Sequence, residues 1–272
     1  MKVFLFSLCM FSICAKKVLA QDMELSLLTF NTMCEFCHKN DADKFIKRKA
    51  KIKEIIKDSD ADIISLQEVI RSSQVEYFID SDKYYTFYYQ NSLISYPDAV
   101  LAIKKKEFIV LDKGHYWLGE DTTEFNFGWK WAMPRILLWM KVRHNQTKKE
   151  FTILGSHFDN RLENLKGASE LVSKIAAEST NIIFLADTNS TYEMDSYKEL
   201  KKNLKDLAKD FEGGREYCYL KKGKKFPSCR VDHIMTNITE VETLEYQVIL
   251  DKVNERFPSD HRPIMAKIKI TD

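Results

Sequence analysis

The sequence is poor in the residues that make chains flexible or repetitive, with 8 glycines and 5 prolines among 272 residues. No stretch resembles a Gly- or Pro-rich linker, and motif matching finds no internal repeat. Beyond the N-terminal segment, no run approaches the roughly 18 apolar residues that a membrane-spanning helix needs. The hydrophobic content of 44% is enough for a substantial core, and a single domain is the simplest division.

The N-terminus has the form of a secretory signal peptide. Lys2 precedes an apolar run over residues 3–15, and Val18-Leu19-Ala20 supplies small or apolar residues before a cleavage site. We expect residues 1–20 to be removed near Ala20, and the mature chain, residues 21–272, to be secreted or periplasmic. The removal takes away three lysines and leaves 39 of the 42 basic residues against 40 acidic ones, a net charge of −1. Such a chain does not hold nucleic acid through gross charge, so any electrostatic grip is local.

Four of the six cysteines remain after this cleavage: Cys34, Cys37, Cys218 and Cys229. An even number in an oxidising compartment predicts disulfides, and the closest pairs in sequence are Cys34 with Cys37 and Cys218 with Cys229. Three connectivities are open. A zinc site formed by Cys34, Cys37 and His38 is disfavoured because the chain has no second Cys-x-x-Cys to complete it.

Six segments each run apolar or lead into a strand and carry a carboxylate, amide or imidazole at the end. They are Leu27-Leu28-Thr29-Phe30-Asn31, Ile63-Ile64-Ser65-Leu66-Gln67-Glu68, Ile153-Leu154-Gly155-Ser156-His157-Phe158-Asp159, Ile182-Ile183-Phe184-Leu185-Ala186-Asp187-Thr188-Asn189, Arg230-Val231-Asp232-His233 and Ser259-Asp260-His261. Short apolar runs are typical of buried strands, and polar groups at strand ends point into a shared crevice in layered α/β proteins. The crevice would combine Asp, Glu, Asn and His. This set suits a hard cation and acid/base chemistry on a phosphate ester.

Helical periodicity separates several of these segments. Residues 43–58 and 162–178 each place apolar side chains on one face, and residues 201–209 form a solvated helical face. Residues 101–111 and 135–142 are predicted strands, whereas residues 114–128 form a long turn-rich excursion. Strands with flanking helices predict an α/β protein whose helices cover packed sheets.

Each polar pair also has an ordinary structural explanation. Asp187 and Asn189 lie two apart and share a face of the strand, although an Asx turn has the same spacing. His157 and Asp159 repeat that geometry. A ligand role is favoured for Glu68, because a carboxylate on a buried strand is costly unless it is paired or binds a metal.

Taken in order, the six segments resemble the signature set of the endonuclease/exonuclease/phosphatase superfamily. Two central motifs, Trp131-Ala132-Met133-Pro134-Arg135 and Ser156-His157-Phe158-Asp159-Asn160, resemble its secreted bacterial branch. The resemblance spans residues 27–270. It implies a four-layer α/β/β/α sandwich of two packed mixed sheets flanked by helices, and a catalytic domain that uses Mg²⁺, Mn²⁺ or Ca²⁺.

The resemblance also implies roles for individual residues. Glu68 would be the main metal ligand, with Asn31 beside it, and Asp260 would hold metal or orient a histidine. His157 and His261 would flank the scissile phosphate, and Asp187 would activate the attacking water. Further roles fall to Asn189 on a phosphate oxygen, Asp232 as an additional acid or second metal position, Arg135 on phosphate, and Asp98 and Asp159 as supports behind the histidine. One departure is Thr188, which stands where the family has an aromatic residue.

Three functions are compatible with these residues, in decreasing order of preference. The first is a secreted metal-dependent phosphodiesterase that acts on nucleic acid and grips its backbone with Lys221-Lys222-Gly223-Lys224-Lys225. The second is a sphingomyelinase-like lipid phosphodiesterase or a sugar or inositol phosphatase. A lipid enzyme needs an exposed apolar hairpin, but residues 125–131 are expected to be partly buried. The third is a non-catalytic binding module. We expect a monomer without a stable protein partner.

Overall fold

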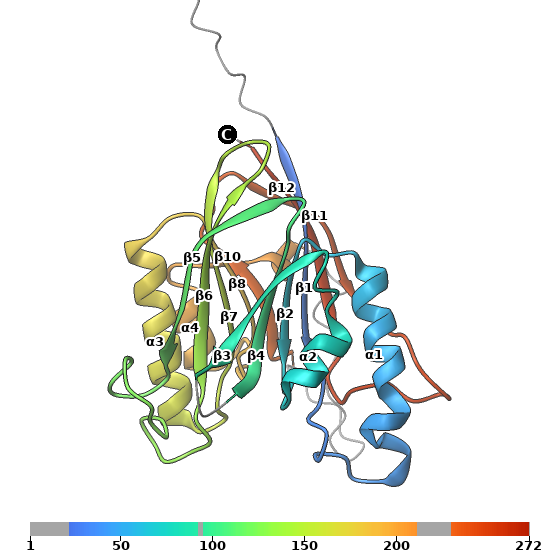
Figure 1. The fold of residues 1–272 in the computed structure, drawn as a ribbon. Coiled ribbons are helices and arrows are strands. Elements are labelled where there is room, and N and C mark those ends of the chain that lie inside the picture. Colours follow the sequence, from blue (N-terminus) through green and yellow to red (C-terminus); the bar gives the residue numbers. More distant parts are fainter. Residues whose placement is uncertain (1–21, 92–94, 211–229, 272) are drawn as a thin grey trace, which may run out of the picture.

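Two six-stranded sheets pack face to face in the computed structural model, which describes residues 22–91, 95–210 and 230–271 (Figure 1). The first sheet has the strand order β11-β12-β1-β2-β4-β3. Its strands are β1 (Met23–Asn31), β2 (Ile63–Gln67), β3 (Tyr84–Gln90), β4 (Ser95–Lys104), β11 (Val241–Val248) and β12 (Ile264–Ile270). Strands β1 and β2 run parallel, and the other neighbouring pairs are antiparallel.

The second sheet has the order β5-β6-β7-β8-β10-β9. Its strands are β5 (Phe108–Trp117), β6 (Ile136–His144), β7 (Glu150–His157), β8 (Ile182–Asp187), β9 (Lys205–Asp206) and β10 (Asp232–Thr236). It too contains one parallel pair, β7 with β8. Both sheets are therefore mixed, as predicted, and each has one pair of strands whose carboxyl ends lie at the same edge.

Helices cover the outer faces of the sheets (Figure 1). The main helix on the first sheet is α1 (Phe45–Ser59), with the short α2 (Ser72–Phe78), and α3 (Leu162–Glu178) and α4 (Asp195–Leu200) cover the second. Two single-turn 3₁₀ helices, η1 (Asp41–Asp43) and η2 (Leu207–Asp210), complete the described elements. The predicted four-layer sandwich is confirmed.

The central core lies between the sheets and joins their strands through side chains such as Leu27, Leu101, Leu138 and Leu185. The sheets approach closely at Gly155 of β7. A Cβ atom there would lie 2.6 Å from Leu101 Cδ2 and 3.1 Å from Ser65 Oγ. Glycine is therefore required sterically at this contact.

Three local predictions differ from the structure. Residues 101–111 are not one strand, because β4 ends at Lys104 and β5 begins at Phe108 after a tight turn. The turn-rich excursion begins later than expected, after β5 ends at Trp117. The predicted helical face at residues 201–209 is also wrong: α4 ends at Leu200, and Leu204, Leu207 and Ala208 are buried against the sheet layers. Among the described residues, no helix is long and apolar enough to cross a membrane.

Candidate active site

Three of the predicted site residues lie side by side at one end of the second sheet. His157 ends β7 and is the parallel partner of Asp187 in β8, and Asp187 is in turn the antiparallel partner of Asp232 in β10. Directly opposed residues on neighbouring strands have Cβ atoms about 5 Å apart. Strand register therefore places His157, Asp187 and Asp232 in one row across the sheet, although they lie 30 and 45 residues apart along the chain.

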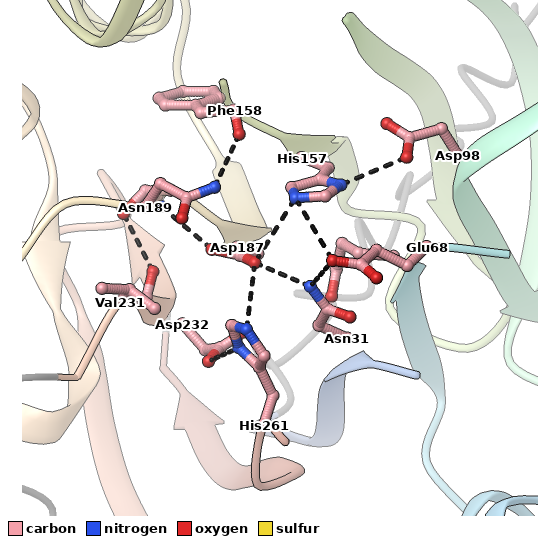
Figure 2. Close-up of polar contacts among 12 residues, drawn as sticks. Asn31, Glu68, Asp98, His157, Phe158, Asp187, Asn189, Val231, Asp232 and His261 are labelled. Atoms are coloured by element: carbon pink, nitrogen blue, oxygen red, sulfur yellow. Dashed lines mark hydrogen bonds and ion pairs between the residues drawn. The ribbon is translucent and has the colours of Figure 1, made fainter. Parts of the chain in front are cut away.

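The first sheet contributes Asn31, the last residue of β1, and Glu68, which follows β2. Asn31 donates from Nδ2 to Glu68 Oε1 at 3.0 Å and to Asp187 Oδ2 at 2.8 Å (Figure 2). The amide thus links the carboxylates of the two sheets. Its own Oδ1 accepts the backbone N–H of Met33, so the orientation of the amide is fixed.

A second histidine, His261, enters from the loop before β12. Its Nδ1 lies 2.8 Å from Asp232 Oδ2, which holds the ring in place, and its Nε2 lies 3.8 Å from Asp187 Oδ2. The Nε2 of His157 lies 3.6 Å from the same oxygen. Two imidazoles therefore face one carboxylate, and the same Nε2 of His157 also lies 4.0 Å from Glu68 Oε1 (Figure 2).

The charges of this cluster depend on one another. Burial alone raises the pKa of Asp187, but His261 and His157 outweigh that effect, and the pKa lies below its usual value. Burial and the neighbouring Asp187 raise the pKa of Asp232 despite the opposing pull of His261. Burial would lower the pKa of His261, yet Asp232 and Asp187 hold it well above its usual value. A buried carboxylate pair is thus stabilised by a charged imidazole.

His157 is supported from behind by Asp98 and Arg135. Its Nδ1 lies 3.2 Å from Asp98 Oδ1 and 2.7 Å from a guanidinium nitrogen of Arg135, which also donates to Asp98 Oδ2 at 2.5 Å. Burial raises the pKa of Asp98, but the charges of Arg135 and His157 lower it by more, so the pKa lies below its usual value. Asp98 is therefore a charged support for the ring. Arg135 lies at the site as predicted, with its contacts directed to these two side chains.

Asn189 and Asp159 occupy different positions relative to the cluster. The backbone N–H of Asn189 donates to Asp187 Oδ1 at 2.9 Å, and its amide donates to the carbonyl of Phe158 at 2.7 Å. Asp159 instead accepts hydrogen bonds from Arg161 and Asn164 at the start of α3. The structure thus places Asn189 beside Asp187, whereas Asp159 organises the loop that follows β7.

The backbone around the site is in an unusual conformation at three residues. Met33, Glu68 and Asn189 have φ of 57°, 59° and 48°, respectively. Left-handed conformations cost non-glycine residues of order 1–3 kcal/mol and persist where the surroundings over-determine them. At Met33 the constraint is the hydrogen bond from its N–H to Asn31, and at Asn189 it is the hydrogen bond from its N–H to Asp187.

The residues present suit a divalent cation. One ligand atom each of Asp187, Asp232 and His261 lies within 4.8 Å of the other two. Asp232 Oδ1 is buried without a hydrogen-bond partner among the described residues, as expected of an oxygen that is free to bind a ligand. Glu68 and Asn31 add oxygen donors nearby. Asp260 is exposed and lies outside this cluster, although its charge still raises the pKa of His261.

Sequence reasoning missed the residues that hold these loops. Arg48 of α1 is 2% exposed and donates to the carbonyls of Thr32, Met33, Cys34, Asp43 and Pro258. It thereby ties the loop after β1 to the loop that carries His261. The signal was present: Arg48 lies three residues after Phe45 and four before Ile52, on the apolar face of the predicted helix, where an arginine is unexpected.

A second buried cluster lies behind Asn189. Asp206 accepts from Arg230 at 2.5 Å and lies 3.5 Å from His233 Nδ1, whose Nε2 lies 2.9 Å from the carbonyl of Ser190. Burial raises the pKa of Asp206, but His233 and Arg230 reverse this and lower it overall. The cluster connects β9 and β10 to the turn that presents Asn189.

Comparison with known proteins agrees with this architecture. The model of the Endonuclease/Exonuclease/phosphatase family matches residues 28–261. A search of curated proteins found no match. Among solved structures, an endonuclease/exonuclease/phosphatase family protein from Bacteroides thetaiotaomicron is 21% identical, with a TM-score of 0.77 over 92% of this chain and 99% of that chain.

Two further structures carry more specific descriptions. The mannosyl-6-phosphatase Bt3783 of Bacteroides thetaiotaomicron is 21% identical, with a TM-score of 0.74 over 90% of this chain and 99% of that one. TDP2 of D. rerio, complexed with a single-strand DNA product, is 19% identical, with a TM-score of 0.67 over 90% and 98%. At these identities the likeness shows the shared fold. The family match covers most of the sequence, and the chain therefore belongs to the endonuclease/exonuclease/phosphatase family of phosphoester hydrolases.

Proposed function

We propose that the chain is a Mg²⁺-dependent phosphodiesterase that cleaves nucleic acid by attack of water on phosphorus. The observation that carries this proposal is the pair of imidazole Nε2 atoms that face Asp187 Oδ2 at 3.6 and 3.8 Å. A carboxylate between two proton carriers is suited to activate water on one side of a phosphate and to assist the leaving oxygen on the other.

The donor set fits Mg²⁺. Glu68 and Asn31 would hold the cation, and Asp232 supplies a buried oxygen without a hydrogen-bond partner among the described residues. Asp260, the further ligand predicted from the sequence, is exposed and is left out of this set. When bound, the cation supplies charge neutralisation for the phosphate oxygens. Mn²⁺ and Ca²⁺ prefer similar oxygen donors, and a panel of metals would separate the three.

The remaining steps belong to the protein. Asp187 accepts a proton from water, and Asn31 and the backbone of Asn189 hold its two oxygens in place. His261, fixed through Nδ1 on Asp232, directs Nε2 toward the phosphate position and donates a proton or hydrogen bond there. His157 performs the matching role from the opposite side, steadied by Asp98 and Arg135.

The charge of the site favours a phosphodiester over a phosphomonoester. Glu68, Asp187 and Asp232 line the cluster, and the guanidinium of Arg135 is already paired with Asp98. A diester carries one negative charge, whereas a monoester approaches two at neutral pH, so the electrostatic cost of entry is smaller for the diester. A sugar or inositol phosphatase remains the alternative to be tested, since one protein of similar fold is a mannosyl-6-phosphatase.

Two features support nucleic acid as the diester. The lysine run at residues 221–225 lies outside the described residues, and its role stays a prediction from sequence. The second feature is an exposed aromatic loop. Phe127 and Trp131 stack with ring centroids 4.1 Å apart, and Trp131 is 73% exposed. Exposed aromatic rings near a phosphate site provide faces on which bases stack.

The same loop is the feature that best supports the alternative function, a lipid phosphodiesterase. Residues 125–131 are partly buried, as predicted, because Trp129 packs against the core on the α3 side. Phe125, Phe127 and Trp131 are exposed, however, as is the nearby Met133. The loop is anchored by Asn164, which exchanges hydrogen bonds with the backbone of Lys130. An anchored apolar loop tip can also insert into a bilayer surface.

One set of assays tests both readings. Purified protein is incubated with Mg²⁺, with and without chelator, on plasmid DNA, RNA, sphingomyelin vesicles, a phosphomonoester and a small nitrophenyl diester. We expect chelator-sensitive cleavage of polynucleotide, and weaker polynucleotide binding with a flatter salt dependence when the four lysines of residues 221–225 become Ser. Cleavage of the small diester should be unchanged by that substitution. Turnover of sphingomyelin alone, lost in Trp131→Ala, would overturn the nuclease proposal in favour of the lipid phosphodiesterase.

We also propose that residues 1–20 direct export of the protein and that the mature protein acts as a monomer.

A further inference from the structure

The loop that holds Glu68 contains a disulfide. Cys34 and Cys37 are bonded to each other, with Cα atoms 5.1 Å apart. The backbone N–H of Cys34 donates to Glu68 Oε2 at 2.7 Å, so the cysteine pair and the predicted metal ligand are direct neighbours. One ligand atom of each of Cys34, Cys37 and Glu68 lies within 4.8 Å of the other two.

This cluster is accessible from solvent. Cys37 is exposed, and Cys34 and Glu68 are half-buried. An exposed disulfide can be attacked by an external thiol or phosphine, which a buried one resists. A metal ion can reach the same atoms.

The loop does not depend on the disulfide alone for its position. Arg48 donates to the carbonyls of Met33 and Cys34, at 2.5 and 3.0 Å. On the other side, Glu35 accepts from Arg71 at 2.9 Å and from Gln74 at 3.2 Å. None of these contacts involves a sulfur atom, so opening of the disulfide removes none of them.

We propose that reduction of the Cys34–Cys37 disulfide creates a site for a thiophilic divalent cation such as Zn²⁺, with two thiolates and the Glu68 carboxylate as ligands. Two cysteines separated by two residues have the spacing of zinc-binding pairs, and a carboxylate and water complete a tetrahedral set. The oxidised form offers no thiolate. The site therefore exists in one redox state only.

The steps balance with a dithiol as reductant. The dithiol gives two electrons and two protons, the Cys34–Cys37 bond breaks to two thiols, and the dithiol becomes its own disulfide. Binding of Zn²⁺ then releases the two thiol protons. Reoxidation by an external disulfide is the reverse exchange: the external disulfide accepts two electrons and two protons and becomes two thiols, the Cys34–Cys37 bond re-forms, and the ion is released.

Occupancy of this site would silence the enzyme. Glu68 is the predicted ligand of the catalytic cation, and its Oε1 accepts from Asn31, which also holds Asp187. Engagement of Glu68 by Zn²⁺ removes it from that arrangement. This consequence rests on the proposed function, whereas the binding of Zn²⁺ does not.

The binding test uses Co²⁺ as a spectroscopic substitute for Zn²⁺. The full chain is reduced with a phosphine, freed of reductant without air, and titrated with Co²⁺ while thiolate-to-cobalt charge-transfer absorbance is followed. The matched control is Cys34→Ser/Cys37→Ser, which keeps every other cysteine. We expect the reduced wild type to bind one more equivalent of Co²⁺ than this control and than the oxidised wild type, and Zn²⁺ to displace it.

Glu68→Gln tests the third ligand. It should weaken Co²⁺ binding on the order of 10-fold or more, because even outer partners of metal ligands are worth 10–100-fold in affinity. Equal Co²⁺ spectra for reduced wild type and the double-serine control would overturn the site, and unchanged affinity in Glu68→Gln would overturn the role of the carboxylate.

The inhibition test uses the best substrate found above. Equimolar Zn²⁺ should inhibit the reduced wild type, reoxidation should restore it, and the double-serine variant should be unaffected. Zn²⁺ binding without inhibition would overturn the silencing while leaving the site. Absence of activity in every form would count against the proposed function, because the cobalt spectra report on the site independently.

Discussion

Replacement of Arg48 should affect both the stability of the fold and the binding of the catalytic cation, and the two effects can be measured separately. Arg48 is 2% exposed and donates five hydrogen bonds to backbone carbonyls, three of which belong to the buried residues Thr32, Met33 and Pro258. Burial lowers its pKa to about 10, opposed by Asp260 and Glu68, so the guanidinium stays charged at neutral pH. The variant Arg48→Met keeps much of the volume and removes every donor.

The expected loss of stability follows from the three buried acceptors. A buried carbonyl left without a partner costs about 1–3 kcal/mol, so Arg48→Met should lower the free energy of unfolding by roughly 3–9 kcal/mol. Urea denaturation measures this. The matched control is Arg256→Met, because Arg256 binds the side chain of Asp43 near the same helix start but is 48% exposed. An exposed ion pair is worth at most about 1 kcal/mol.

The folded variant should also bind the catalytic cation less tightly. Arg48 fixes the carbonyl of Cys34, whose N–H holds Glu68, and Pro258 in the loop that leads to His261. Hydrolysis is measured without urea, where Arg48→Met is folded. The variant should then need on the order of 10-fold more Mg²⁺ than wild type for half-maximal hydrolysis. Arg256→Met should behave as wild type. A folded Arg48→Met with an unchanged Mg²⁺ requirement would refute the reasoning.

Three further predictions concern the site and its support. Glu68→Gln should abolish hydrolysis while leaving the melting temperature near that of wild type, and near-normal activity at low Mg²⁺ would remove Glu68 from the metal site. His157→Ala and His261→Ala should each lower the rate on the order of 10²-fold or more, and a full rate in either would make that histidine structural. The depressed pKa of Asp206 contributes stability above the unfolded pKa near 4 that is lost as the pH falls. Asp206→Asn should therefore be less stable than wild type at pH 7, with a difference that shrinks below about pH 4.

Much of the fold could be predicted from the sequence because the strands that lead to the site are buried along most of their length. The strands that end at Asn31, His157 and Asp187 each contain a short apolar run, and each ends at the predicted residue. The boundary errors fall where side chains do not alternate clearly. Residues 105–107 form a tight turn without glycine or proline, so residues 101–111 resembled one strand.

The parts of the site that escaped prediction are those made by the backbone. Cys34 contacts Glu68 through its N–H, and Asn189 contacts Asp187 in the same way, so neither interaction depends on a side-chain pattern. Asp159 shows the converse. Its spacing from His157 matched a shared strand face, but β7 ends at His157, and the chain turns before Asp159 reaches that face.

The site is assembled across the interface between the two sheets, and this explains why the central core matters for chemistry as well as stability. Glu68 and Asn31 come from the first sheet, and His157, Asp187 and Asp232 from the second. The hydrogen bond from Asn31 Nδ2 to Asp187 Oδ2, 2.8 Å long, connects the two sheets. Its length depends on how closely the sheets pack, and Gly155 shows that they pack in contact with no room for a methyl group. The geometry around Asp187 is therefore set by core residues distant from any substrate.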